Sequence, residues 1–192
     1  MNKKYIEIIW HGRGGQGAIT AGQLMANSAY HEGFRGMTAV PIFGAERRWA
    51  PVRAFLRLSK EPVNIFSQIE DPDIIVVLDP TLLPIINIHL NPRKDITVIV
   101  NSNKKIEEIG LQDFQKVGIA DITRIALNNN LTIAGSSILN TPILGAFAKT
   151  TGLVSMPSIE KSIITRLGEK QGAANIKAAK ETFEATTVYT RN

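Results

Sequence analysis

The residues best suited to chemistry form a glycine-rich stretch near the N-terminus of the chain. This stretch follows an apolar run over residues 5–10 and precedes a helix-like pattern, and it consists of His11, Gly12, Arg13, Gly14, Gly15, Gln16 and Gly17. Glycines allow a tight turn and let a ligand approach the backbone, while the following helix directs its positive dipole end into the same space. Strand, glycine turn and helix in this order predict a binding site for an anion such as a phosphate.

The glycine stretch matches neither standard nucleotide motif. Gly12, Gly14 and Gly17 have G-x-G-x-x-G spacing, but the next strand candidate, 36–41, ends without the acidic residue that would hold a ribose. Gly17 is followed by Ala18-Ile19, where a Walker motif has Lys and Ser or Thr. Arg13 adds a planar cation with several donors to the turn. The loop is therefore compatible with an anion without being a recognised dinucleotide or P-loop sequence.

A second conspicuous segment is the turn over residues 41–52, which combines acidic, basic and aromatic side chains. Its members of interest are Phe43, Glu46, Arg47, Arg48 and Trp49. The run that follows, 52–58, alternates and places Arg53, Phe55 and Arg57 on one face of a strand. This pattern indicates a surface that meets a negative or hydrogen-bonding partner, and an ordinary solvated hairpin is the alternative interpretation.

These segments together resemble the gamma subunit of the 2-oxoacid:ferredoxin oxidoreductases, most closely the pyruvate (pyruvate synthase) type. The resemblance rests on residues 11–17, on 43–52 and, nearer the C-terminus, on 140–147 and 152–154. It extends over essentially the whole chain. The family usually has Gly where this chain has Trp49, and a bulky aromatic there could reshape the turn.

Composition limits the function further. The 192 residues, 44% of them hydrophobic, suffice for one core, so we expect a single domain over 1–192. Apolar runs are too short to cross a bilayer, and no signal-peptide region is evident, which favours the cytoplasm. The absence of cysteine excludes cysteine-ligated iron–sulfur clusters on this chain, so any redox centre must be on another polypeptide. The net charge of +5 is spread along the sequence with only 6% aromatics, which argues against nucleic acid.

Periodicity predicts an α/β protein, namely a three-layer α/β/α domain with a mixed, mostly parallel sheet and a Rossmann-like first βα unit. The 52–58 strand is expected to continue into 63–66. Predicted strands cover 5–10, 36–41, 52–58, 73–78, 96–101 and 117–121, and predicted helices cover 82–90, 123–128, 143–150, 158–167 and 173–184.

The sequence offers no catalytic residue and no metal site. Its histidines are too scattered for a triad or a metal cluster, and we expect His11 to be satisfied by backbone hydrogen bonds. Asp79 follows a buried strand, where α/β proteins place functional groups, although it could equally cap the next turn.

The resemblance implies a role in a larger enzyme, which converts pyruvate, coenzyme A and oxidised ferredoxin to acetyl-CoA, carbon dioxide and reduced ferredoxin. Thiamine diphosphate with Mg and the iron–sulfur clusters would be on alpha, beta and delta-type (ferredoxin-like) subunits, and ferredoxin would accept the electrons. This chain would help to bind coenzyme A and would be inactive alone. The phosphate-binding candidates are Gly12, Arg13, Gly14, Gly15, Gln16, Gly17 and Gln23, and the interface candidates are Phe43, Glu46, Arg47, Arg48 and Trp49.

Three alternatives remain open from the sequence. The same kind of enzyme could act on branched-chain 2-oxoacids, the subunit could be purely architectural, or the chain could be a Rossmann-type nucleotide-binding protein.

Overall fold

The computed structural model describes residues 4–42, 49–88, 91, 93–133 and 135–191. Four of the predicted interface residues, Phe43, Glu46, Arg47 and Arg48, lie outside the described residues. Trp49 is described, as are all the predicted phosphate-binding residues.

The described part of the chain is organised around a seven-stranded mixed sheet with the order β2-β3-β1-β4-β5-β6-β9. Strands β1, β4, β5 and β6 are parallel, whereas β2, β3 and β9 add antiparallel pairings at the two sides. The mixed α/β sheet predicted from the sequence is confirmed. The strand bounds are β1 (Ile6–Arg13), β2 (Gly36–Ile42), β3 (Pro51–Ser59), β4 (Ile74–Val77), β5 (Thr97–Asn101), β6 (Lys116–Ala120) and β9 (Thr187–Thr190).

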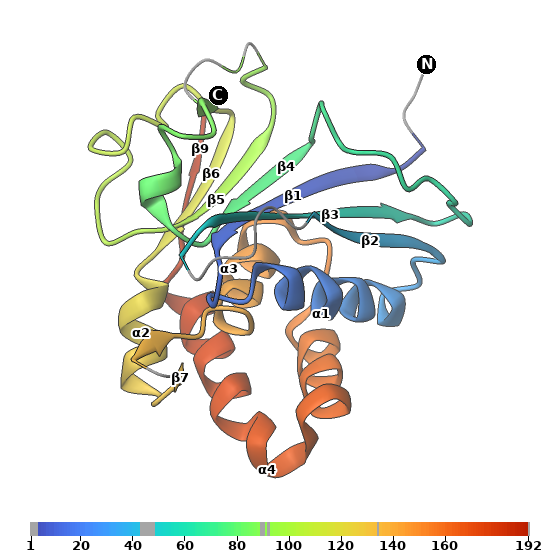
Figure 1. Cartoon of the computed structure of the whole chain (residues 1–192), viewed down its shortest axis with the longest axis vertical. Coiled ribbons are helices and arrows are strands. Elements are labelled where there is room, and N and C mark those ends of the chain that lie inside the picture. The colour runs from blue at the N-terminus through green and yellow to red at the C-terminus, as the bar shows by residue number, and fades with distance from the viewer. Residues whose placement is uncertain (1–3, 43–48, 89–90, 92, 134, 192) are drawn as a thin grey trace.

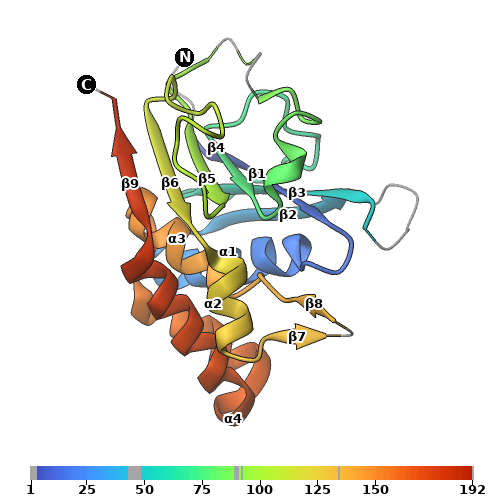
Figure 2. The same ribbon diagram turned by 90° about the vertical axis from the view of Figure 1, so that its left-hand side faces the viewer.

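The described α-helices are α1 (Ala18–His31), α2 (Ile122–Asn128), α3 (Pro142–Thr151) and α4 (Met156–Ala185), and α4 breaks into two helical segments at Gly168. Helices α1 and α3 pack on one face of this sheet, and α4 packs on the outer side of these two helices (Figure 1). The other face is covered by the short 3-10 helix η1 (Pro80–Leu82) and by connecting segments rather than by regular α-helices (Figure 2). None of the described helices combines the length and apolar character needed to cross a lipid bilayer.

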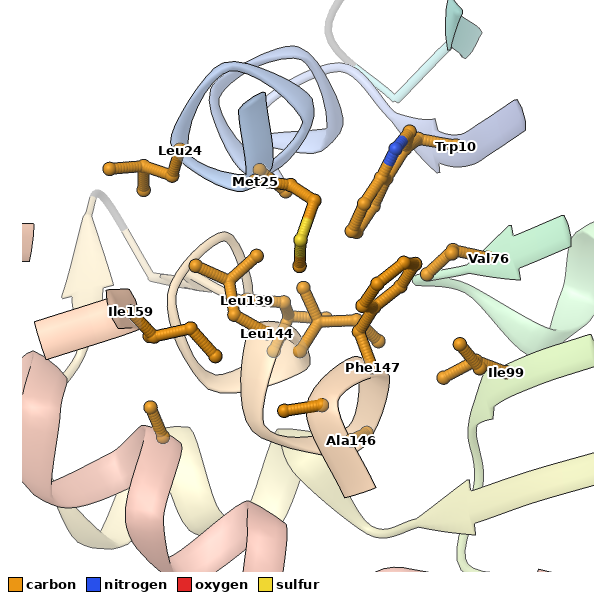
Figure 3. Packing of buried hydrophobic residues seen from close by; sticks show 14 of the residues in the cluster. Trp10, Leu24, Met25, Val76, Ile99, Leu139, Leu144, Ala146, Phe147 and Ile159 are labelled. Atoms are coloured by element: carbon orange, nitrogen blue, oxygen red, sulfur yellow. The ribbon is translucent and has the colours of Figure 1, made fainter. Parts of the chain in front are cut away.

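Alternation along β1 decides which side chains face the helices. Ile8 and Trp10 are fully buried on the helix side, and the Trp10 ring stacks on Phe147 of α3 with centroids 5.6 Å apart (Figure 3). Because successive side chains of a strand point to opposite faces, Ile9 and His11 point to the side that lacks long helices. The side chains on the helix face of β1 therefore belong to the core beneath the helices, whereas Ile9 and His11 lie on the face that lacks long helices.

Three local predictions differ from the structure. Residues 82–88 form η1 and turns instead of a helix, since Pro84 lacks an N–H donor and Asn87 has a φ of 52°. Strand β3 ends at Ser59 and does not continue into 63–66. The edge strand β9 and a small hairpin of β7 (Thr132–Ile133) and β8 (Ser136–Ser137) were not predicted, because such short polar segments carry little periodicity.

Candidate anion site at the ends of strands β1 and β4

The candidate site lies at the topological switch point of the sheet, where the order of successive strands reverses its direction. From β1 the chain continues through α1 to β2 and β3 on one side, and it then returns to β4 on the other side. Arg13 ends β1, and Asp79 follows its parallel neighbour β4, so both side chains are at the carboxyl edge of the sheet. Open α/β sheets bind ligands in the crevice at such a switch point.

Arg13 connects three segments of the chain that are distant in the sequence. Its Nε donates to Asp79 Oδ2 over 3.0 Å, its Nη2 donates to Thr81 Oγ1 over 2.8 Å, and its Nη1 donates to the Trp49 carbonyl oxygen over 3.1 Å. Each guanidinium nitrogen therefore has one partner among the described residues, and these three bonds use three of its five N–H donors. Arg13 therefore holds these three segments together in addition to carrying a positive charge, and we call this arrangement the Arg13 clamp.

Asp79 is the acceptor at the centre of this arrangement. Its Oδ2 also accepts from Gln16 Nε2 over 3.1 Å, and its Oδ1 accepts from the backbone N–H and the hydroxyl of Thr81. Burial alone would raise the pKa of Asp79, but the hydrogen bonds from Thr81 and Gln16 and the charge of Arg13 outweigh burial and lower it. The carboxylate is therefore ionised at neutral pH, and it both caps η1 and fixes the glycine loop.

The glycine loop presents backbone rather than side chains to the outside. Gly15 has a φ of 99° and a Cβ at this position would meet nothing within 4 Å, whereas a Cβ on Gly17 would lie 2.8 Å from the Asn140 Cβ. Helix α1 begins after Gly17 without a side-chain cap. The backbone N–H groups of Gly15 and Gly17 have no acceptor among the described residues. These N–H groups and the first turn of α1 are the available anion donors.

The side chains predicted to bind phosphate have different positions. Both polar groups of the Gln16 side chain are hydrogen-bonded within the chain, because Oε1 accepts from the Arg13 backbone N–H over 2.8 Å and Nε2 donates to Asp79. Gln23 is exposed on α1 and borders a small gap next to β2 and β3, with no hydrogen bond to the Arg13 clamp among the described residues. The assignment of these residues to a phosphate stays a prediction.

Trp49 takes a left-handed backbone conformation that favours glycine. Its φ is 73°, its side chain is 53% exposed, and its N–H donates to the Gly14 carbonyl oxygen over 3.3 Å. Only glycine adopts this left-handed region without a steric cost. The turn is therefore held in a glycine-type conformation by Arg13 and Gly14 despite the aromatic side chain.

Sequence reasoning missed Thr81 and gave Asp79 only an uncertain role. The available signal was the position of Asp79-Pro80-Thr81 directly after the buried strand β4, where functional groups of α/β proteins gather. A cleft of about 630 Å³ begins at Thr81 and extends between residues 80–84 and 102–110. Its size is that of a pocket for a small organic ligand.

Two sequence expectations about side chains on the opposite face of the sheet were wrong. The His11 carbonyl oxygen accepts from the Leu78 N–H over 2.8 Å, but the His11 imidazole makes no hydrogen bond to another described residue, although the residue is only 7% exposed. Burial, helped by the nearby Arg53 charge, lowers its pKa to about 4. Arg57 is not part of a basic surface: it is 3% exposed and its Nε donates to Glu7 Oε1 over 2.8 Å, because Glu7 lies opposite it in the β1–β3 ladder.

The Arg13 and Asp79 arrangement offers hydrogen-bond donors and a positive charge to a ligand. The described residues contain no cluster of three or more His, Asp or Glu side chains that could hold a metal ion. The strand order differs from that of a dinucleotide-binding Rossmann unit, because the antiparallel strand β3 lies between β1 and β2, which would pair directly in that unit.

The chain matches a known family and known structures along nearly its full length. Residues 7–185 match the family model described as pyruvate ferredoxin/flavodoxin oxidoreductase. The pyruvate/ketoisovalerate oxidoreductases common subunit gamma of Thermococcus litoralis is 45% identical over 188 residues, which are 96% of this chain and 98% of that protein.

Two solved structures extend the comparison. The pyruvate oxidoreductase subunit PORC of Thermotoga maritima is 37% identical with a TM-score of 0.81, over 97% of this chain and 99% of that chain. A 2-oxoglutarate:ferredoxin oxidoreductase of Magnetococcus marinus, with 2-oxoglutarate, coenzyme A and succinyl-CoA bound, shares the fold at 18% identity with a TM-score of 0.73, over 97% of this chain and 32% of that chain.

Proposed function

The chain belongs to the pyruvate ferredoxin/flavodoxin oxidoreductase family as a gamma-type oxidoreductase subunit, and we propose that it helps a pyruvate:ferredoxin oxidoreductase to bind coenzyme A. The reaction converts pyruvate, coenzyme A and oxidised ferredoxin to acetyl-CoA, carbon dioxide and reduced ferredoxin. The names of the relatives from Thermococcus and Thermotoga support pyruvate as the substrate. The word ketoisovalerate in the first of these names supports branched-chain 2-oxoacids as the alternative.

The observation that carries the proposal is the uncapped start of α1 beside an open glycine loop. Unpartnered N–H groups of Gly15 and Gly17 and the dipole of α1 favour a phosphate, and coenzyme A carries several. The two free donors of Arg13 would add to this set. The cleft that begins at Thr81 has room for an uncharged part of the ligand. The coenzyme A in the related Magnetococcus structure is consistent with this assignment.

The proposal includes a division of labour among subunits. A chain without cysteine cannot ligate an iron–sulfur cluster through thiolates, so we assign the clusters and thiamine diphosphate with Mg to alpha, beta and delta-type subunits, with ferredoxin as acceptor. This chain then acts as one domain over 1–192, in the cytoplasm, where coenzyme A and ferredoxin are used. Within the enzyme its task is to bind and orient coenzyme A, and the chemistry supplied by thiamine takes place on other chains.

The experiment places a negative charge at the start of α1 without disturbing the Arg13 clamp. Thr20 lies in the first turn of α1, and Asn27 is exposed later on the same helix. Thr20→Glu complements the helix dipole, so stability should be kept, but it should repel a phosphate and raise the KM for coenzyme A roughly tenfold. Asn27→Glu adds the same charge away from the loop and should leave this KM unchanged.

The readout is steady-state kinetics of the assembled enzyme with a viologen acceptor. The KM for the 2-oxoacid should stay constant in both variants, because thiamine chemistry is assigned to other chains. An unchanged coenzyme A KM in Thr20→Glu would reject the phosphate site.

An architectural role for the glycine loop is the second candidate, and two observations favour it. The side chains of Arg13 and Gln16 are already engaged within the chain, and Gly17 allows close contact with Asn140. If the loop only packs, Thr20→Glu and Asn27→Glu should have the same kinetics. Arg13→Ala should then reduce stability without a selective effect on coenzyme A.

A further inference from the structure

A cleft of about 650 Å³ opens on the face of the sheet that lacks long helices. Its floor is formed by alternate residues of β1 and β3, among them Ile9, His11 and Arg53. Its walls come from the segments 68–72 and 82–88 and from Asn91. This cleft is separate from the glycine loop, and neither the proposed coenzyme A site nor the core accounts for it.

His11 contributes unused hydrogen-bonding groups to this cleft. The ring is 7% exposed, lines the cleft and has no hydrogen-bond partner in the described part of the chain. Its lowered pKa of about 4 means that the ring is neutral at physiological pH, with one donor and one acceptor nitrogen. Because the ring lines the cleft and its nitrogens bond to no other described residue, they are available to a group that enters the cleft.

Arg53 contributes an unpaired charge next to His11. The two residues lie directly opposite each other in the β1–β3 ladder. The Arg53 side chain is exposed and forms no ion pair with any described carboxylate, and its guanidinium is 5.9 Å from the Phe55 ring centroid. Glu70 lines the same cleft without reaching ion-pair distance. A guanidinium in this position is suited to a carboxylate, which it can bind through two parallel hydrogen bonds.

Ile85 exposes a large apolar side chain at the cleft, and Phe66 does so in the segment that leads to the cleft wall. Ile85 lines the cleft and is 56% exposed, and Phe66, two residues before the lining residue Gln68, is 69% exposed. The Phe66 segment is fixed in place, since Arg57 donates to the carbonyl oxygens of Ile65 and Ser67. An exposed apolar side chain and an arginine that line the same cleft are typical of protein–protein interfaces.

We propose that this cleft receives a segment of another subunit of the same enzyme, with an acidic side chain bound to Arg53 and an apolar side chain packed on Ile85. The proposal rests on the assignment of the chain as an oxidoreductase subunit. The carboxylate follows from the unpaired Arg53 on a chain with a net charge of +5. His11 donates to the same segment and lowers the cost of its own burial when the complex forms.

The first test reverses the charge at Arg53. The chain is co-expressed with its partner subunits and the complex is isolated through a tag on a partner. Arg53→Glu should weaken assembly at least tenfold, whereas Arg53→Lys should retain part of it. Arg166→Glu, which changes another exposed arginine on α4, is the matched control and should assemble like the parent chain.

The second test separates assembly from stability at His11. His11→Leu places an apolar side chain at a mostly buried position, so the free chain should be no less stable while the complex becomes weaker. His11→Gln keeps a donor and an acceptor and should preserve assembly better than His11→Leu. Loss of a merely structural histidine would not weaken the complex while the free chain stays as stable.

The results also distinguish this proposal from the coenzyme A site. If Arg53→Glu and His11→Leu both assemble with parental affinity, the docking proposal is wrong, whatever Thr20→Glu does to the KM for coenzyme A. If assembly is lost in Arg53→Glu while Thr20→Glu has no kinetic effect, the docking proposal stands and the phosphate site fails. A third outcome would assign the cleft to a small ligand and overturn the docking proposal. In that outcome Arg53→Glu assembles with parental affinity, the parent complex binds a small carboxylate such as 3-methylbutanoate, and the Arg53→Glu complex does not bind it.

Discussion

Arg13 and Asp79 form an ion pair between the carboxyl ends of β1 and β4, with Nε 3.0 Å from Oδ2 and side-chain exposures of 22% and 14%. The two residues are 66 positions apart in the sequence. Their contact joins the glycine loop to the turn after β4. Arg13 therefore stabilises the site in addition to offering a positive charge to a phosphate.

We predict that this pair stabilises the chain by about 1–2 kcal/mol, as expected for a partly buried, charge-assisted contact. The variants Arg13→Gln, Asp79→Asn and their combination form a double-mutant cycle measured by urea unfolding. Asn at position 79 can still accept from Thr81, so the coupling reports the contact with Arg13. Additive effects of the two substitutions would show that the ion pair contributes nothing.

Trp49→Gly should stabilise the free chain relative to Trp49→Ala by about 1 kcal/mol. Both variants remove the exposed aromatic side chain, but alanine keeps the steric cost of the left-handed conformation at a φ of 73° and glycine does not. The two thermal unfolding curves give the difference directly. Equal melting temperatures would mean that the turn relaxes when the tryptophan is removed.

His11 should make the chain less stable in mild acid. Its pKa is lowered from 6.5 to about 4 in the folded state, so between these values the unfolded chain binds a proton that the folded chain does not. Stability therefore falls as pH decreases through this window, by roughly 3 kcal/mol in total, and the loss is complete below the folded pKa.

The measurement compares urea unfolding of the parent chain and His11→Leu across this pH window. Arg53 and Glu70 face the same cleft and are present in both proteins, so the difference between the curves isolates His11. Parallel curves for the two proteins would contradict the assigned pKa.

Glu7→Gln should destabilise the chain by about 3 kcal/mol, because it leaves the buried Arg57 guanidinium without its counter-charge. Lys4 and Glu61 form an exposed pair at 3.4 Å, and Glu61→Gln is the matched control with little expected effect. Chemical denaturation of both variants tests this. A small loss in Glu7→Gln would mean that the carbonyl oxygens around Arg57 are sufficient partners.

The sequence by itself determined the parts of the molecule that depend on local pattern. The apolar runs predicted β4 and β5, the helix-like pattern after Gly17 predicted α1, and the glycines predicted an open turn between β1 and α1. These features follow from backbone geometry and side-chain periodicity over a few residues, which one segment carries on its own.

Only the tertiary structure decided what the polar side chains contact. The strand order places Asp79 next to Arg13, and the β1–β3 register places Glu7 opposite Arg57 so that the two form a buried ion pair. The pleat of β1 directs the His11 side chain away from the glycine loop, although the two are adjacent in sequence. Arg53 and Arg57 look equivalent in an alternating run, yet one is exposed and the other is fully paired. The reason is physical: a charge is satisfied by groups that are close in space, and strand pairing, not sequence spacing, fixes which groups those are.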